Sequence, residues 1–261
     1  MITEVEKSSA KGLSQDQIDF FWKNGYLKVG KVFTDEEIAL LGAEYLLEIE
    51  KGRASNNCHN LSAGTGSDSK ANPSALKQVF QIINMCNRNI HFRKLLYDSR
   101  ILDIVQSLVG PNIMLFHDQA LYKPAHTGGA VYWHQDNAYW KCRPANLVSC
   151  WMTFDNVVKE SGAMQVIPGS HLNPVWHETH RDTNALLEID GVDTTKAHVL
   201  ELPAGGIMFH HCQTLHYTDP NTTSVQRRAY AIHFMSPGTW SESSNSTLGV
   251  DFSHPMLRAK I

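Results

Sequence analysis

The 261-residue sequence has no marked excess of charge of either sign. It contains 23 lysines and arginines against 26 aspartates and glutamates, a formal net charge of −3 at pH 7. A basic surface that would attract nucleic acid or an anionic membrane is therefore not expected, and a small molecule is the expected partner. Apolar side chains make up 42% of the residues, enough for a substantial core in one domain.

Long hydrophobic runs and paired cysteines are also lacking. No uninterrupted stretch of eighteen apolar residues occurs, and the charged start, Met1 to Lys7, has no apolar segment of a secretory signal. The five cysteines form no Cys-x-x-Cys pair and are odd in number, which favours reduced buried thiols over a disulfide framework. These absences predict a cytoplasmic protein.

Helical patterns dominate the first part of the chain. Two capping-box patterns predict helices that begin near Ser14 and Thr34 and end at Gly25 and Gly52. Residues 53–73 lose this periodicity and are expected to form a lid or substrate loop. Two more helices are expected near 88–97 and 100–109.

From Asn112 onward the pattern changes to short runs rich in β-branched and aromatic residues. The predicted strands lie near 112–123, 129–135, 146–154, 163–167, 198–202, 206–211 and 227–235. This order predicts a mainly β protein with flanking α-helices, in which a barrel or jelly roll follows a helical N-terminal third. We expect one domain over 1–261, with a mainly helical part at 1–111, the strand-rich core at 112–236 and a C-terminal tail at 237–261.

The chain is rich in histidine, with 14 residues, and one His-x-Asp triplet lies at the end of a predicted strand. A spacing of two aims the side chains of His134 and Asp136 at the same face. Two imidazoles and one carboxylate on one face of Fe(II) leave the opposite positions open, as in non-haem Fe(II) oxygenases. The alternative is that Asp136 only orients His134. A second triplet, at 180–182, lies in a polar stretch and is expected to be a loop without a catalytic role.

Three histidines could supply the second nitrogen ligand. His210 and His211 end a predicted strand, and because they are adjacent at most one of them faces the interior. His216 follows five residues after His211. The residue pattern by itself leaves these alternatives open.

Further landmarks occur in a characteristic order along the chain. They are Asp19-Phe20-x-x-x-Asn24-Gly25-Tyr26-Leu27, Gly110-Pro111-Asn112-Ile113-Met114, His134-Gln135-Asp136 with Arg143-Pro144, Ser161 through His171, Phe209 and His211, His216, and Asn221 through Arg227-Arg228-Ala229. In this order they resemble the phytanoyl-CoA dioxygenase family, within the Fe(II)/2-oxoglutarate oxygenases. The resemblance covers residues from roughly 14 to 236.

The resemblance implies a double-stranded β-helix, or jelly-roll, core in which His134, Asp136 and His216 bind Fe(II). It also implies that 2-oxoglutarate chelates the iron through its keto and C1 carboxylate groups and that its far carboxylate meets Arg227. A guanidinium fork matches a carboxylate bidentately and stays charged at any working pH. Arg228 is the competitor, but neighbouring strand residues face opposite ways and we expect Arg227 to enter the barrel.

Other positions follow with less support from the residues alone. With His216 as the ligand, we expect His211 to have a structural role or to support a ligand, and His210 to face outward. The resemblance places further side chains near cosubstrate or substrate: His117, Gln119, Gln135, Trp151 and Thr218, with a looser match at Lys77 and Gln81. Core packing is the alternative role for Trp151, and a buried, hydrogen-bonded histidine is the alternative for His117.

The implied reaction consumes O2 and 2-oxoglutarate, releases succinate and CO2, and hydroxylates an unactivated C–H bond of a small-molecule metabolite. A natural-product intermediate is one candidate for that metabolite. Ascorbate is the expected reductant in vitro. Related halide-transferring enzymes lack a carboxylate at the Asp136 position, so its presence favours hydroxylation. Desaturation, epoxidation and ring closure remain alternatives, as do a non-catalytic cupin-like metal or ligand binder and a zinc- or manganese-dependent isomerase or hydrolase. An acyl-CoA substrate is disfavoured, because no lysine or arginine cluster awaits its phosphates and Ala259-Lys260-Ile261 departs from a peroxisomal signal.

Overall fold

The computed structural model describes residues 12–61, 78–179, 187–189 and 191–260. The triplet at 180–182, Lys77 and most of the expected loop at 53–73 lie outside these ranges. The helices are α1 (Gln15–Asn24), α2 (Asp35–Ala54), α3 (Ile90–Leu95), α4 (Ser99–Val109) and the short α5 (Asn137–Trp140), with 3-10 turns η2 (Met85–Asn87), η3 (Lys159–Ser161), η4 (Ser170–Leu172) and η5 (Thr194–Lys196).

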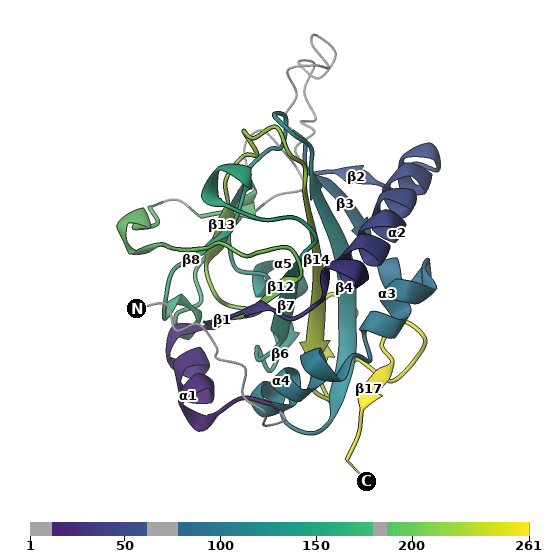
Figure 1. The fold of residues 1–261 in the computed structure, drawn as a ribbon. Coiled ribbons are helices and arrows are strands. Elements are labelled where there is room, and N and C mark those ends of the chain that lie inside the picture. Colours follow the sequence, from purple (N-terminus) through teal and green to yellow (C-terminus); the bar gives the residue numbers. More distant parts are fainter. Residues whose placement is uncertain (1–11, 62–77, 180–186, 190, 261) are drawn as a thin grey trace.

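The strands form two main sheets, whose neighbouring strands run antiparallel. They are β1 (Tyr26–Lys31), β2 (His59–Asn60), β3 (Phe80–Ile83), β4 (Ile113–Lys123), β5 (Val131–His134), β6 (Cys142–Arg143), β7 (Val148–Thr153), β8 (Met164–Val166), β9 (Glu178–Thr179), β10 (Leu187–Glu188), β11 (His198–Leu200), β12 (Gly206–His211), β13 (His216–Thr218), β14 (Arg227–Met235), β15 (Trp240–Ser241), β16 (Ser246–Thr247) and β17 (Met256–Arg258). The large sheet has the order β1-β12-β7-β14-β4-β3-β2, with β17 also beside β4, and the small sheet has the order β11-β8-β13-β5. The remaining strands form two minor sheets, β10-β9 and β16-β15-β6. The predicted jelly-roll core with flanking helices is confirmed (Figure 1).

Local signals fix the ends of the first two helices. The Ser14 hydroxyl accepts from the backbone N–H of Gln17 at 3.3 Å, and the Gln17 side chain accepts from the N–H of Ser14 at 2.9 Å. Thr34 and Glu37 repeat this capping box at the start of α2. Gly25 ends α1 with a φ of 80°, a left-handed conformation that glycine adopts without strain. The second helix runs to Ala54, two residues beyond the predicted end at Gly52.

Three strands before residue 112 have no clear signal in the sequence. β1 pairs with β12, β3 pairs with β4, and the two-residue β2 pairs with β3 inside the segment expected to be a loop. Short strands of this kind are stabilised by their partners across the sheet more than by their own pattern. The N-terminal part is therefore mainly helical but also supplies both edges of the large sheet.

The helices cover the outer face of the large sheet. α2, α3 and α4 lie on one side of it (Figure 1), and their apolar residues join the outward side chains of β7, β12 and β14 in one continuous core. Phe92 of α3 packs edge-on against Tyr230 of β14, with ring centroids 4.9 Å apart. A second cluster fills part of the space between the two sheets, where Trp151 and Met208 meet Met164 and Leu200.

Among the described residues no helix is both long and apolar enough to cross a membrane. All five cysteines are free, and four of them are buried, as the sequence predicts.

Candidate active site

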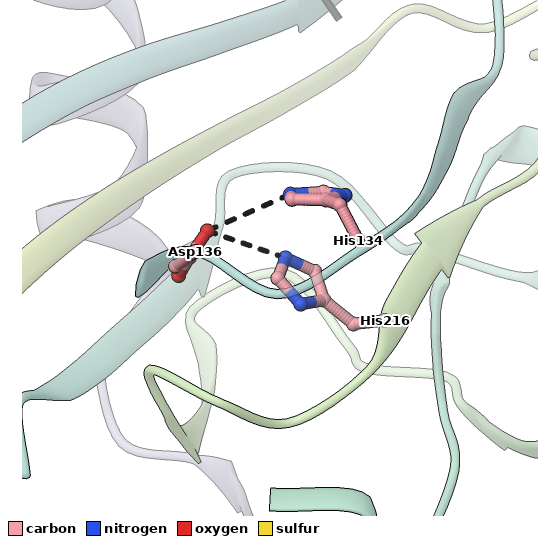
Figure 2. Close-up of side chains that lie close together, drawn as sticks. All are labelled: His134, Asp136 and His216. Carbon is pink, nitrogen blue, oxygen red and sulfur yellow. Dashed lines mark ion pairs between the residues drawn. The ribbon is translucent and has the colours of Figure 1, made fainter. Parts of the chain in front are cut away.

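Two strands of the small sheet bring the predicted metal ligands together. His134 ends β5, Asp136 follows two residues later, and His216 begins β13 directly opposite His134 in the sheet. One carboxylate oxygen of Asp136 lies 3.5 Å from Nε2 of His134 and 3.6 Å from Nε2 of His216 (Figure 2). The three candidate donor atoms lie within 4.8 Å of one another, and all three side chains are buried.

Backbone carbonyls orient both imidazoles. Nδ1 of His134 donates to the carbonyl of Tyr132 at 2.7 Å, and Nδ1 of His216 donates to that of Thr214 at 2.9 Å. With the proton held on Nδ1, each ring turns a free Nε2 lone pair toward Asp136, as metal-binding histidines do. Two nitrogens and one oxygen on one side of a shared point suit Fe(II) and leave its other positions open.

The charge states also suit a metal. Burial opposes ionisation of Asp136, but the neighbouring His216 and His134 and a hydrogen bond from His210 hold the pKa of Asp136 well below its usual value. Burial, followed by the neighbouring His134, holds the pKa of His216 well below its usual value. The site therefore offers an ionised carboxylate and a neutral imidazole, which are the forms that bind metal ions.

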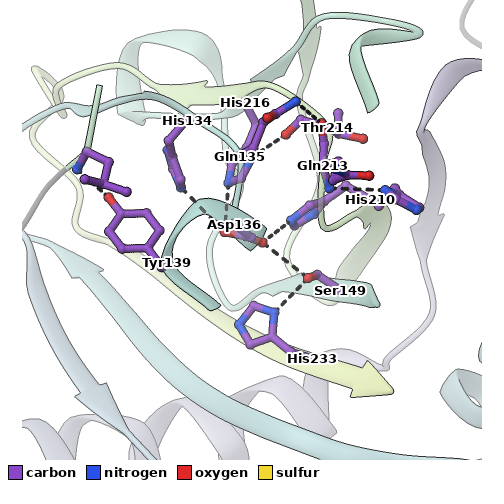
Figure 3. A network of polar contacts seen from close by, with 12 residues as sticks. His134, Gln135, Asp136, Tyr139, Ser149, His210, Gln213, Thr214, His216 and His233 are labelled. Atoms are coloured by element: carbon purple, nitrogen blue, oxygen red, sulfur yellow. Dashed lines mark hydrogen bonds and ion pairs between the residues drawn. The ribbon is translucent and has the colours of Figure 1, made fainter. Parts of the chain in front are cut away.

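The second oxygen of Asp136 is held by the large sheet. Nε2 of His210 lies 3.0 Å from it, and the Ser149 hydroxyl lies 3.4 Å from it (Figure 3). The hydrogen bonds continue from Ser149 to Nδ1 of His233 at 2.7 Å, and from Nε2 of His233 to Gln119 at 3.0 Å. This series of hydrogen bonds orients the carboxylate of Asp136 and connects it to Gln119 on β4.

The outward orientation expected for His210 is wrong. Its ring points to Asp136 and is 2% exposed, whereas His211 lies on the other face, with its ring 5.2 Å from that of His171 and 5.8 Å from that of Trp22. Adjacent residues do face opposite ways, as expected. Because α1 and η4 cover the outer face of the sheet, both histidines are buried, and the sequence pattern does not distinguish the inward residue from the outward one.

The two adjacent arginines separate as predicted. Arg227 is 2% exposed and turns into the space between the sheets, where its Nη1 donates to the carbonyl of Leu121 at 2.8 Å and its Nε has no hydrogen-bond partner. Burial lowers the pKa of Arg227 to about 10, so it remains charged at neutral pH. Arg228 turns outward into an ion pair with Asp155 at 2.6 Å. A buried guanidinium with an unused donor and no carboxylate partner suits an acidic ligand.

Thr218 is held next to Arg227 by a buried lysine. Nζ of Lys123 donates to the Thr218 hydroxyl at 2.7 Å and to the Thr218 carbonyl at 3.1 Å, and also to the carbonyl of Asp219 at 2.5 Å. Burial and then the nearby Arg227 lower the pKa of Lys123 well below its usual value. Because the Thr218 oxygen accepts from Lys123, its own hydrogen is free to donate into the cavity.

A cavity of about 410 Å³ lies between the sheets and contains the triad in its wall. Five of the predicted pocket residues line it: His117, Gln119, Trp151, Thr218 and Arg227. Gln81 lines it as well. Gln135 is not among the lining residues, since its side chain bonds to backbone groups of Asn173, Val175 and Gln213. The Gln135 side chain instead holds the backbone at Asn173, Val175 and Gln213 beside the triad.

Sequence reasoning missed an aromatic part of the wall. Phe116 is the extra residue of a β-bulge, because β14 pairs His233 with His117 and then Phe234 with Leu115. Bulges re-aim side chains, and here Phe116 and His117 both line the cavity, together with Trp140 at the end of α5. A bulge in β4 depends on pairing with β14, more than 100 residues away, so no local signal predicts it.

Comparisons with known proteins agree with this geometry. A family model described as phytanoyl-CoA dioxygenase (PhyH) matches residues 21–229. A probable alpha-ketoglutarate-dependent hypophosphite dioxygenase of Stutzerimonas stutzeri is 26% identical over 230 residues, which cover 83% of this chain and 76% of that protein. Human peroxisomal phytanoyl-CoA dioxygenase is 27% identical over 237 residues, which cover 86% of this chain and 69% of that protein.

Solved structures agree at the level of the fold. The non-haem alpha-ketoglutarate-dependent carbocyclase SnoK from nogalamycin biosynthesis superposes with a TM-score of 0.76 at 19% identity, covering 97% of this chain and 99% of that one. EvdO2 from Micromonospora carbonacea var. aurantiaca, complexed with 2-oxoglutarate, gives a TM-score of 0.63 at 27% identity, covering 86% and 91%. The chain is thus an enzyme that uses Fe(II) and 2-oxoglutarate (alpha-ketoglutarate), and it belongs to the phytanoyl-CoA dioxygenase family.

Proposed function

We propose that the protein hydroxylates a C–H bond of a small-molecule metabolite, with Fe(II) held by His134, Asp136 and His216 and the far carboxylate of 2-oxoglutarate held by Arg227. The observation that carries the proposal is the convergence of three buried donor atoms beside a cavity that also contains the Arg227 guanidinium, whose Nε has no hydrogen-bond partner among the described residues. A small molecule is also the substrate in the name of the ectoine dioxygenase of Stutzerimonas stutzeri strain A1501, 26% identical over 240 residues.

Fe(II) held by the three ligands, together with 2-oxoglutarate held by Arg227, would supply the oxidative chemistry for an unactivated C–H bond, with O2 consumed and succinate and CO2 released. The chain's own task begins with the carboxylate of Asp136. Hydrogen bonds from His210 and Ser149 occupy one of its oxygens and turn the other toward the two imidazoles. Each ligand atom is therefore aimed before a metal arrives.

Arg227 and Thr218 form the cosubstrate end of the cavity in this proposal. The guanidinium can donate two parallel hydrogen bonds to a carboxylate, and the hydroxyl of Thr218 can add a third. The Trp151 ring lies 5.8 Å from the guanidinium carbon and covers it, which keeps water from competing for these donors. Arg227 thus recognises the far carboxylate of 2-oxoglutarate at one end of the molecule, while the metal binds the other end.

The carboxylate of Asp136 supports hydroxylation over halide transfer, because a halide would need the coordination position that Asp136 takes. The buried imidazoles of His117 and His233 keep polar edges near the metal without adding charge, since burial lowers the pKa of His117 to about 4 and that of His233 well below its usual value. The buried side chains around the site limit the access of water, which would otherwise quench the oxidant.

The proposal is tested by succinate formation from 2-oxoglutarate with Fe(II), O2 and ascorbate, without a primary substrate. We expect slow but measurable turnover in the wild type and none in Asp136→Ala or His216→Ala, because each removes a ligand. His211→Ala is the matched histidine control, since its ring lies on the other face of the large sheet. Succinate formation by purified Asp136→Ala or His216→Ala at the wild-type rate would exclude the assigned triad.

A further inference from the structure

The cavity has two chemically different ends along strand β14. Arg227 lies at one end, and His233 lies six residues further along the same strand, about 20 Å away at the usual rise of a strand. Between them, Ala231 leaves space in the floor of the cavity. If 2-oxoglutarate reaches from the metal toward Arg227, as proposed above, the end beside His233 is left for the primary substrate.

Four rings, which we call the aromatic wall, form that second end: Phe116, His117, Trp140 and His233. His117 stacks on His233 with ring centroids 4.3 Å apart and an interplanar angle of 28°. Trp140 packs against this stack, 4.7 Å from His233 and 5.3 Å from His117, and Phe116 lies 5.1 Å from Trp140. The β-bulge at Phe116 is what brings the fourth ring to the cavity.

The charges of the occupied site cancel. Among the described residues that line the cavity, Asp136 is the only acid and Arg227 the only strong base. The two positive charges of Fe(II) and the one of Arg227 equal the three negative charges of Asp136 and the 2-oxoglutarate dianion. Tyr139 and Tyr217 also line the cavity and carry no charge at neutral pH, since a tyrosine ordinarily titrates at about pH 10. Among the described lining residues, no charge remains to pair with a charged substrate.

Charged groups just outside the Arg227 end of the cavity do not alter this balance. Nζ of Lys123 is directed at three oxygens of Thr218 and Asp219 and does not line the cavity. The ion pair of Arg228 with Asp155 lies on the outer face of the sheet. A charged group entering the cavity would therefore lose its hydration without gaining a partner, which is strongly unfavourable.

We propose that the part of the primary substrate that enters the cavity is an uncharged aromatic or conjugated ring, which packs on the aromatic wall beside the metal. The inference rests on the proposed function, because the charge balance includes iron and 2-oxoglutarate. Aromatic rings favour edge-to-face and offset contacts with rings such as those of Phe116 and Trp140. A hydroxyl on such a ring is compatible with Nδ1 of the buried His117, which has no hydrogen-bond partner among the described residues.

Binding of four matched probes tests the proposal without turnover. The protein is loaded with Mn(II) and 2-oxoglutarate and titrated at pH 7, by calorimetry, with 1-naphthol, 1-naphthoate, 1-naphthylmethylamine and decahydro-1-naphthol. We expect 1-naphthol to bind at least about tenfold more tightly than the anion or the cation, because neither charge has a partner. The saturated alcohol, of similar size but without a π-system, should bind about threefold to tenfold more weakly than 1-naphthol.

Two variants test whether the binding preferences of the probes arise from the side chains that line the cavity. Phe116→Leu keeps an apolar side chain but removes a ring, and should lower the preference for 1-naphthol over its saturated analogue. Ile83→Glu adds a negative charge at the cavity, and should raise the affinity for 1-naphthylmethylamine relative to 1-naphthol. Leu172→Glu is the matched control, because Leu172 is exposed and does not line the cavity. It should leave the order of the probes unchanged.

The outcomes separate this inference from the proposed function. Failure to bind 2-oxoglutarate in the presence of Mn(II) would refute the proposed cosubstrate site itself. If 2-oxoglutarate binds but a charged probe binds as tightly as 1-naphthol, the charge argument is overturned. Equal affinity for the saturated alcohol, or no binding of 1-naphthol to the loaded protein, overturns the role of the aromatic wall.

Discussion

The two faces of the large sheet can be compared through two pairs of identical neighbours, His210 with His211 and Arg227 with Arg228. The outward members have partners within the protein: Arg228 pairs with Asp155 at 2.6 Å, and Nδ1 of His211 accepts from the backbone N–H of Gln213 at 3.1 Å. Of the inward members, Arg227 has a donor without a partner and His210 bonds to a carboxylate assigned to the metal. In both pairs the outward residue thus bonds within the protein, while the inward residue is turned toward the proposed ligand site.

The largest expected effect is on stability and arises on the outer face. Phe234→Ala should lower the free energy of unfolding by about 3–5 kcal/mol, because it removes a fully buried ring from the core under the helices. Leu121→Ala on the inner face should cost clearly less, since Leu121 borders a cavity and packs on fewer sides. Denaturant unfolding measures both variants, and equal losses would break the proposed division between the faces.

The adjacent arginines give the next largest effect. Arg227→Ala should weaken 2-oxoglutarate binding by about 2–5 kcal/mol, roughly 30-fold or more, because a buried charge partner is removed. Arg228→Ala should leave this affinity near the wild-type value and lower stability instead, since Asp155 loses its ion pair. Titration of 2-oxoglutarate into the Mn(II)-loaded variants tests the comparison. A loss of affinity in Arg228→Ala alone would reverse the assignment.

His211 makes stability depend on acid pH. Burial, followed by the nearby His171 and His210, lowers its pKa from 6.5 to about 4, so between these values the unfolded chain binds the proton and the folded protein does not. Neutral His211 therefore makes its full contribution to the free energy of unfolding above pH 6.5. This contribution decreases by on the order of 2–3 kcal/mol as the pH falls toward 4. Unfolding curves of the wild type and His211→Leu between pH 4 and 7 should converge in acid. Parallel curves would contradict the shift.

The smallest expected effect concerns the metal. His210→Phe removes the donor that orients Asp136 and should weaken Mn(II) binding about 10- to 100-fold. His211→Phe makes the same change one residue further along, on the outer face, and should leave Mn(II) affinity close to that of the wild type. Equal losses in the two variants would show that the ring of His210 acts only by packing.

Features encoded by short spacings were predictable from the sequence. The capping boxes at Ser14 and Thr34 give the helix starts. His134 and Asp136 converge as their close spacing predicts, although β5 ends at His134 and the backbone of Asp136 is already helical. Alternation along β14 likewise separates Arg227 from its neighbour. In each case the physical cause lies within a few residues, so the pattern alone carries the information.

Features that depend on distant pairing were not predictable. The inward turn of His210 follows from its place in β12, beside β7 and across from Asp136. The bulge at Phe116 arises from the register between β4 and β14, and β3 becomes a strand through its pairing with β4. Sequence alternation gives the relative direction of neighbours but not which of them faces the centre when both faces are covered.

Lys123 has a consequence for how the enzyme acquires its metal. Its bonds to Thr218 tie the strand that begins at His216 to the large sheet, and backbone carbonyls hold the imidazoles of His134 and His216, the proposed ligands. Contacts within the fold thus position these ligands. We therefore expect iron removed by a chelator to be replaced without a refolding step, so that the protein can pass repeatedly between metal-free and metal-bound forms.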